Sequence, residues 1–183
     1  MAIMYPNLLQ VVTLKSSGIT DITQLKGRNI STGSPGSGTN FMAEVVLNAV
    51  GVEKGSYKDS RLSFTETANA LRDGTIDVGF WSVGPGTSSI LDLATTHDIH
   101  IINFTPEQQQ KILAANSQYS AVDLSGGVYR GMDKAVPTIG VWNVMICQAG
   151  LSTDLVYKLV KSLYEHQDYL LKIHPSASYT TPE

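Results

Sequence analysis

A glycine-rich stretch at residues 33–40 (GSPGSGTN) constrains the fold most. Residues 29–32 before it resemble a strand, and apolar residues over 41–49 recur at helical spacing, so the stretch is predicted to be a strand-to-helix loop. Glycines let a backbone approach a ligand, and a helix start offers free N–H groups and partial positive charge. Such a loop suits a carboxylate or a phosphate. The alternative is a plain turn with Ser37 or Thr39 as helix cap.

The stretch lacks groups that known phosphate-binding motifs need. Gly33 and Gly38 have the Walker A spacing, but Thr39 and Asn40 stand where that motif has lysine and a hydroxyl residue. Phe41 stands where a dinucleotide-binding loop has a third small residue. The loop therefore offers donors without a cation or a base, which favours holding an anion over cleaving one.

Composition narrows the class of protein. The 183 residues are 42% hydrophobic and 16% charged, which is enough apolar material for one folded domain. The net charge of −3 and the absence of a basic run argue against a nucleic-acid partner. No apolar run approaches the roughly 20 residues of a membrane span. Because the first residues lack the features of a signal peptide, we expect a cytoplasmic chain or one whose natural N-terminus has been removed.

Predicted strands and helices alternate along the chain. Strands are predicted over 8–14, 29–32, 61–65, 76–83, 100–104 and 138–148. Helices are predicted over 22–25, 41–50, 67–72, 88–96 and 106–116, with the longest starting at Thr153 or Asp154 and carrying a wide apolar stripe. Residues 118–137 are predicted to be irregular and the tail 176–183 to be loose. This alternation predicts an α/β fold with a mostly parallel sheet flanked by helices.

Two predicted loops, 33–40 and 81–87, each follow a strand and precede a helix. Sheets of this type bind ligands at the carboxyl ends of their strands. If the two strands are parallel, both helix starts face one crevice. Trp81 then offers its ring to the apolar part of a ligand. Packing of Trp81 in the core is the equal alternative.

The other chemically active residues form no recognisable set. The single cysteine, Cys147, lies in an apolar run and is predicted to be a buried thiol rather than a nucleophile. Asp77 lies within an apolar predicted strand. It is either a buried charge with a role or a residue that points to solvent at a sheet edge. No metal or cofactor is predicted, because metal-ligand spacing is lacking among His97, His100, His166 and His174.

Several stretches together resemble one family. They are Tyr5-Pro6, DITQLKGR at 21–28, GSPGSGT at 33–39, ALRDGTID at 70–77, and VYKLVK at 156–161 with His174-Pro175. They resemble the TAXI-type solute receptors of TRAP (tripartite ATP-independent periplasmic) transporters, which are similar to type II periplasmic binding proteins. The resemblance covers nearly the whole chain.

This resemblance implies a periplasmic or exported receptor without catalytic activity. In such receptors two α/β lobes close on a small ligand, commonly an organic acid or acidic amino acid, and deliver it to a sodium-coupled membrane permease. The implied carboxylate-binding residues are Ser34, Gly36, Ser37, Gly38, Thr39 and Asn40. The implied cleft-lining residues are Trp81, Ser82, Val83 and Gly84, with Thr138 as a contact on the hinge side.

Family members are longer, so the chain resembles a receptor without most of its first lobe. Residues 1–14 are expected to be the crossover strand from that lobe. Residues 15–137 are expected to form the ligand-binding lobe, and 138–183 the return strand and C-terminal helix of the incomplete other lobe. A lobe-facing surface left exposed in this way favours a homodimer or a domain swap.

The sequence thus predicts a receptor for a small carboxylate, such as a glutamate-like amino acid or an organic acid. One alternative is an α/β enzyme acting on an anionic small molecule, with Asp77 or Glu66 as the base. Another is an interaction protein that binds no small molecule.

Overall fold

The computed structural model describes residues 2–181. Its strands are β1 (Ala2–Leu14), β2 (Asn29–Ser31), β3 (Lys58–Asp59), β4 (Val78–Val83), β5 (Ile99–Ile101), β6 (Ser120–Leu124) and β7 (Val136–Met145). Its α-helices are α1 (Gly38–Ala49), α2 (Phe64–Arg72), α3 (Ser88–Thr96), α4 (Pro106–Ala115), α5 (Thr153–Glu165) and α6 (Gln167–Ile173). The 3₁₀ helices are η1 (Lys15–Ser17), η2 (Ile22–Leu25) and η3 (Pro175–Tyr179).

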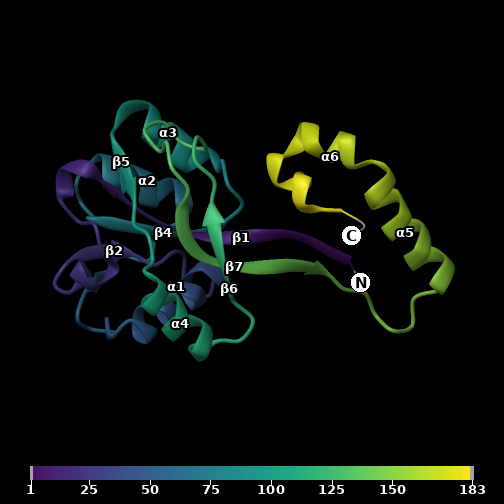
Figure 1. Cartoon of the computed structure of the whole chain (residues 1–183), viewed down its shortest axis with the longest axis horizontal. Coiled ribbons are helices and arrows are strands. Elements are labelled where there is room, and N and C mark those ends of the chain that lie inside the picture. Colours follow the sequence, from purple (N-terminus) through teal and green to yellow (C-terminus); the bar gives the residue numbers. More distant parts are fainter. Residues whose placement is uncertain (1, 182–183) are drawn as a thin grey trace.

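Two parts of the molecule are distinct in Figure 1. The lobe, residues 8–140, is a sheet with helices on both faces. The arm, residues 2–7 and 141–181, consists of the outer halves of β1 and β7, which pair with each other, and of α5, α6 and η3 beyond them.

The sheet is mixed, with strand order β3-β2-β4-β1-β7-β6, and β5 pairs with β1 beyond the end of β7. β2 is parallel to β3 and β4. β1 is antiparallel to β4, β5 and β7, and β6 is antiparallel to β7. The α/β class with a helix-flanked sheet is therefore confirmed, but the expected mostly parallel pairing is wrong. The chain enters the lobe along β1 and leaves it along β7, so these long neighbours run in opposite directions.

Two apolar cores lie on opposite faces of the sheet. β1 supplies both, because its side chains alternate: Leu9 and Val11 pack with α1 and α4, whereas Leu8 and Val12 pack with α2 and α3. Burial on both faces explains the continuous apolar run in β1. Figure 1 shows α1 and α4 on one side of the sheet and α2 and α3 on the other.

Local capping signals set several element boundaries as predicted. Asp21 and Gln24 form a capping box at η2. Thr105 and Gln108 form another at α4, with Pro106 at its first position. The strand predicted over 61–65 is wrong, because Ser63 and Glu66 form a capping box that starts α2 there. Within the region predicted to be irregular, β6 pairs with β7.

Two predictions about the C-terminal part are also wrong. The thiol of Cys147 is exposed, because β7 has already left the lobe at this point. The tail is not loose over residues 176–181: Ser176 and Thr180 are buried, and the Thr180 hydroxyl donates to Met4 O at 2.9 Å. Residues 182–183 lie outside the described range. Among the described helices, none combines the length and apolar character needed to cross a bilayer.

Candidate functional site

The two glycine-rich loops lie at one edge of the sheet. β2 and β4 are parallel neighbours, with Ile30 opposite Val78, so both strands end at the same edge, as predicted. The first turn of α1 reaches the end of β4, where the Ser82 N–H donates to Thr39 Oγ1 at 3.2 Å. The loop 33–40 and the loop 83–87 are therefore neighbours at the carboxyl ends of β2 and β4.

The loop 33–40 has the conformation that its glycines predict. Gly33 (φ +95°) and Gly36 (φ +74°) are in the left-handed region. The Ser37 hydroxyl accepts from the Asn40 N–H at 3.1 Å and so caps α1, whereas Thr39 does not. The N–H groups of Gly38 and Thr39 have no acceptor within residues 2–181. The loop is thus a capped turn that still presents free donors.

The predicted residues of this loop differ in accessibility. Ser34, Ser37 and Asn40 are partly exposed, and Gly36 and Gly38 are exposed. Thr39 is buried, and its hydroxyl is already bonded to Ser82. The Thr39 side chain therefore supports the loop by joining it to β4.

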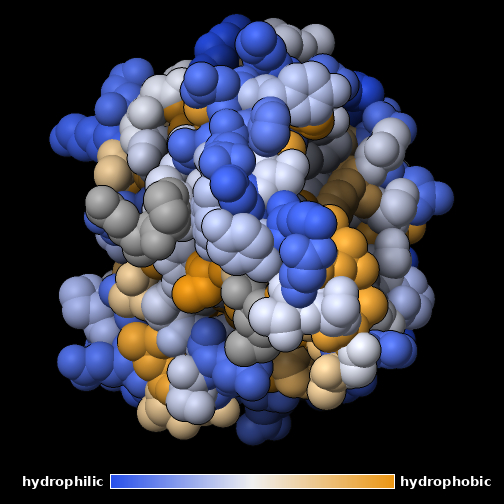
Figure 2. All heavy atoms as spheres, turned by 90° about the vertical axis from the view of Figure 1, so that its right-hand side faces the viewer, coloured by the Kyte–Doolittle hydropathy of each residue, from blue (hydrophilic) through white to orange (hydrophobic). Residues whose placement is uncertain are grey.

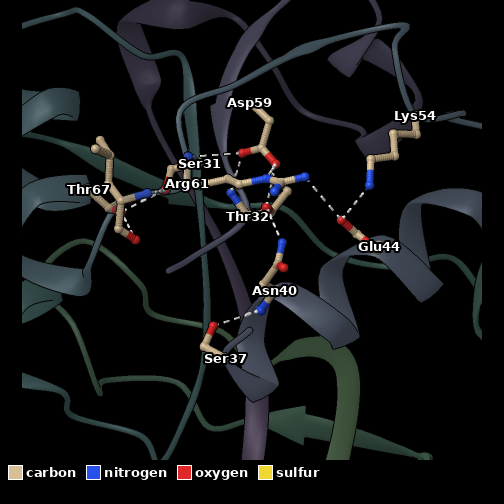
Figure 3. A network of polar contacts seen from close by, with 10 residues as sticks. Ser31, Thr32, Ser37, Asn40, Glu44, Lys54, Asp59, Arg61 and Thr67 are labelled. Atoms are coloured by element: carbon tan, nitrogen blue, oxygen red, sulfur yellow. Dashed lines mark hydrogen bonds and ion pairs between the residues drawn. The ribbon is translucent and has the colours of Figure 1, made fainter. Parts of the chain in front are cut away.

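A polar network ties this loop to the neighbouring strands (Figure 3). Asp59, at the end of β3, accepts from the Thr32 N–H at 3.1 Å and from the Thr32 hydroxyl at 2.7 Å. The Asn40 side-chain amide donates to Thr32 Oγ1 at 2.8 Å. Asp59 thereby links the ends of β2 and β3 to the first turn of α1.

Arg61 adds a cation at this edge that sequence reasoning missed. Its Nε lies 3.3 Å from Asp59 Oδ2, and its guanidinium lies 3.7 Å from Glu44 Oε1 (Figure 3). Its φ of +46° is unusual for a residue with a side chain. Glu44 also pairs with Lys54 at 3.2 Å, so the cluster has no net charge. No local sequence signal identifies Arg61, because its position follows from the pairing of β2 with β3.

Of the two alternatives left open for Trp81, the structure shows core packing. The side chain is fully buried, its ring stacks on Phe64 at a centroid distance of 6.3 Å, and Nε1 donates to Ser89 at 3.1 Å. Alternation along β4 turns Trp81 toward α2 and α3, and turns Ser82 toward Met42 of α1. Ser82 is also buried.

Buried polar groups hold the loop at 83–87 in place. Gln10 Nε2 donates to Val83 O at 3.2 Å. The Tyr129 hydroxyl donates to Gln10 Oε1 and accepts from the Gly86 N–H at 3.2 Å. Burial raises the pKa of Tyr129 to about 12, so the phenol remains a neutral donor. Thr138 is buried in β7, and its hydroxyl donates to Leu9 O in β1.

A pocket of about 480 Å³ opens on the other side of the loop at 83–87. Among the predicted site residues, Val83 and Gly84 line it, and no residue of 33–40 does. Its remaining lining comes from the start of β1, Thr87, α6 and the segment 174–180. Val83 and Gly84 thus line a pocket that contains no residue of the loop 33–40, whereas Trp81, Ser82 and Thr138 are buried.

Comparison with known proteins assigns the chain to a family. A model of the NMT1-like family matches residues 1–183. The alkanesulfonate-binding protein SsuA from Xanthomonas axonopodis pv. citri bound to MOPS is 14% identical, with a TM-score of 0.51 over 97% of this chain and 53% of that one. A putative L-cystine ABC transporter from Listeria monocytogenes is 13% identical, with a TM-score of 0.51 over 92% of this chain and 56% of that one. These likenesses show a shared fold, and the chain spans about half the length of either structure.

Proposed function

The chain belongs to the NMT1-like family, and we propose that it is a solute-binding component of a membrane transporter that binds a small carboxylate. The free N–H groups of Gly38 and Thr39, at the start of a twelve-residue helix, carry this proposal. One structural neighbour is named for alkanesulfonates and another for L-cystine, and both compounds carry anionic groups.

The binding edge is built to hold an anion. The amides of Gly38 and Thr39 and the partly exposed hydroxyl of Ser34 supply donors. The partial positive charge of the α1 start favours a carboxylate there. Arg61 lies at the same end of the strands, where Asp59 and Glu44 pair with its charge. The binding step needs no bond cleavage.

The carboxylates considered for an enzyme both have structural partners. Asp77 accepts from the Asn29 N–H at 2.9 Å and lies 3.8 Å from Arg28. Glu66 accepts from the Ser63 N–H at 2.9 Å in the capping box of α2, and these hydrogen bonds lower its pKa. Neither carboxylate is bonded to the loop 33–40, which favours a receptor over an enzyme.

The family resemblance supports a finer proposal. The chain is then an exported receptor of the TAXI type that works with the permease subunits of a TRAP transporter. Residues 15–137 then form the ligand-binding lobe, residues 1–14 are the crossover strand, and residues 138–183 belong with a facing lobe. The pairing of β1 with β7 and the projection of α5 away from the lobe support this division (Figure 1). Closure of the facing lobe over the loop 33–40 encloses the ligand. A homodimer or a domain swap through the arm is the other way to cover it.

An amide NMR titration with glutamate, 2-oxoglutarate, succinate and phosphate tests the proposal. We expect carboxylates to shift the amides of residues 33–40. Gly38→Ala is the sharpest variant, because an added Cβ meets no atom within 4 Å and φ is not positive, yet the methyl group obstructs the anion. It should weaken binding about tenfold or more while leaving stability unchanged or slightly higher. Ser34→Ala should weaken binding about three- to tenfold.

Gly150→Ala is the matched control, since an added Cβ there also meets open space, in the connection before α5. It should leave both affinity and stability unchanged. Shifts with phosphate alone would favour the enzyme alternative. Carboxylate affinity that survives Gly38→Ala would disprove the site assignment.

A further inference from the structure

A groove of about 450 Å³, which we name the β5 groove, lies between β5 and the segment 131–137. β5 pairs with residues 12–14 of β1, whereas the end of β4 that carries the loop at 83–87 pairs with Leu8. The β5 groove is therefore at the end of the sheet away from the loop 33–40. Figure 1 shows β5 in the half of the lobe remote from the arm.

The β5 groove runs along a free strand edge. β5 pairs with β1 alone, and the Ile102 N–H just after it donates to Val11 O at 2.9 Å. Backbone groups of alternate residues in a strand point to opposite neighbours. The N–H and C=O groups of Ile99 and Ile101 therefore point away from β1, and both residues line the groove. These groups form no hydrogen bond within residues 2–181, so they can pair with an added strand.

Hydrogen bonds hold the opposite wall of the β5 groove in place. The Gly127 N–H donates to Met132 O at 2.6 Å, which closes the loop before the segment 131–137. Arg130 Nε donates to a backbone oxygen of α3 at 2.6 Å. At one end of the groove, the Phe104 N–H donates to Pro137 O at 3.0 Å. The separation between β5 and the opposite wall is therefore a fixed feature of the fold.

The β5 groove offers an apolar surface on one face of the sheet. The side chains of Ile99 and Ile101 belong to the core on the α2 and α3 side, and Met132 and Val136 pack against that core. All four residues line the groove. Alternate side chains of a strand point to the same face. A strand added here therefore places every second side chain beside this apolar surface.

The charged residues of the β5 groove favour an acidic partner. Its lining includes Lys15, Lys134 and Asp133, two positive charges and one negative, which leaves one positive charge. Burial, and then Lys15, lower the pKa of His100, so its ring adds no charge at neutral pH. Neither lysine forms an ion pair within residues 2–181. Lysines disfavour pairing of this edge with the same edge of a second copy, because like charges would meet.

We propose that the β5 groove binds an extended acidic segment of a partner protein, which adds a strand to the free edge of β5. The backbone groups of Ile99 and Ile101 pair with the segment. Lys15 and Lys134 attract its acidic side chains, and the alternate apolar side chains pack on Met132. The three residues of β5 span about 10 Å, so about three residues of the segment are paired.

The test is an amide NMR titration of the chain 1–183 with the peptide acetyl-Glu-Val-Glu-Val-Glu-amide. We expect saturable shifts at the amides of Ile99 and Ile101 and slower exchange of both with solvent, because they gain acceptors. Exchange of the Ile102 amide, which is already bonded, should not change. The same peptide N-methylated at its three central residues cannot pair and should bind at least about tenfold more weakly.

Two charge variants and a lysine peptide separate a specific site from general attraction. Lys134→Glu should weaken binding about three- to tenfold. Lys26→Glu is the matched control, because Lys26 is an exposed lysine of the lobe that does not line the β5 groove. It should leave the affinity unchanged, and thermal melting should show that both variants remain folded. A peptide with lysine in place of glutamate should bind about tenfold more weakly.

Several results would overturn the proposal. They are the absence of shifts at Ile99 and Ile101, equal binding of the N-methylated peptide, and equal affinity in the Lys134→Glu variant. Shifts of these amides that depend on protein concentration without peptide would also overturn it, because the edge would then pair with a second copy. The amides of residues 33–40 report solute binding separately, so either site can fail without the other.

Discussion

The helices of the lobe and of the arm both carry apolar residues. Those residues are buried in the lobe and exposed in the arm. In the lobe, every α-helix places apolar side chains in one of the two cores. In the arm, α5 and α6 contain no buried residue, and Ile146 and Leu159 are 72% and 51% exposed. Figure 2, which views the molecule from the side of the arm, shows apolar side chains on this surface. The buried residues of the arm lie in the first strand and near the C-terminus: Ala2, Pro6, Ser176, Ala177 and Thr180.

This difference shows that an amphipathic pattern and a buried helix are separate properties. α5 has the apolar stripe that the sequence predicts, with a cap at Ser152 and an ion pair between Asp154 and Lys158 at 2.7 Å. Its stability still depends on packing, because a short helix alone is marginal in water. An exposed apolar surface of this kind is typical of an interface.

The largest expected effect comes from a matched pair of leucine truncations. Leu47→Ala, in α1, opens a cavity in the core and should lower the free energy of unfolding by about 2–5 kcal/mol. Leu159→Ala, in α5, removes a half-exposed side chain and should change it by less than about 0.5 kcal/mol. Urea unfolding measures both. A large loss in Leu159→Ala would mean that the arm is covered in solution, and its dependence on protein concentration would reveal a second copy.

A smaller effect is expected at the junction of the two regions. Tyr129→Phe leaves Gln10 Oε1 and the Gly86 N–H without their partner and should cost about 1–3 kcal/mol. Tyr157→Phe, on the exposed surface of α5, is the control and should be neutral. The raised pKa of Tyr129, about 12, stabilises the fold at pH values below the ordinary tyrosine value of 10.0. This contribution is lost as the pH rises toward 12, and Tyr129→Phe should lack that loss.

The smallest effect is a pH dependence within the lobe. Burial, and then the charge of Lys15, lower the pKa of His100 from 6.5. The unfolded chain therefore binds the proton more readily, and stability falls as the pH drops below 6.5 toward the lower pKa of the folded state. Urea midpoints at a series of pH values between 7.5 and 5 should show a shallower slope for His100→Gln than for the parent chain. Equal slopes would show that His100 does not contribute.

Local features of the fold could be predicted from the sequence, and long-range features could not. Capping boxes such as those at Asp21 and Thr105 act within four residues, so they fixed helix starts correctly. The antiparallel pairing of β1 with β7 joins residues more than a hundred positions apart and leaves no local pattern. The exposure of Cys147 was missed for a related reason: an apolar run indicates burial without indicating which partner provides it.

The candidate site divides in the same way. The loop 33–40 was identified because glycines and a cap residue mark a helix start directly, and Ser37 has that role. For Trp81 the sequence left core packing and ligand contact equally open, because the face to which a strand side chain points depends on the pairing register. Arg61 was missed because it reaches the loop 33–40 through the pairing of β2 with β3, which the sequence does not display.

The connection between lobe and arm has a mechanical consequence. β1 and β7 form one hydrogen-bonded ladder from Leu8 and Gly140 to Ala2 and Met145, interrupted by a register shift between Ile3 and Pro6. Proline has no N–H to donate there, so the ladder is weakest at this point. Two bonded strands resist twisting far more than a single linker does. We therefore expect the paired strands to bend near Pro6 rather than to twist. The angle between arm and lobe should then vary in one direction.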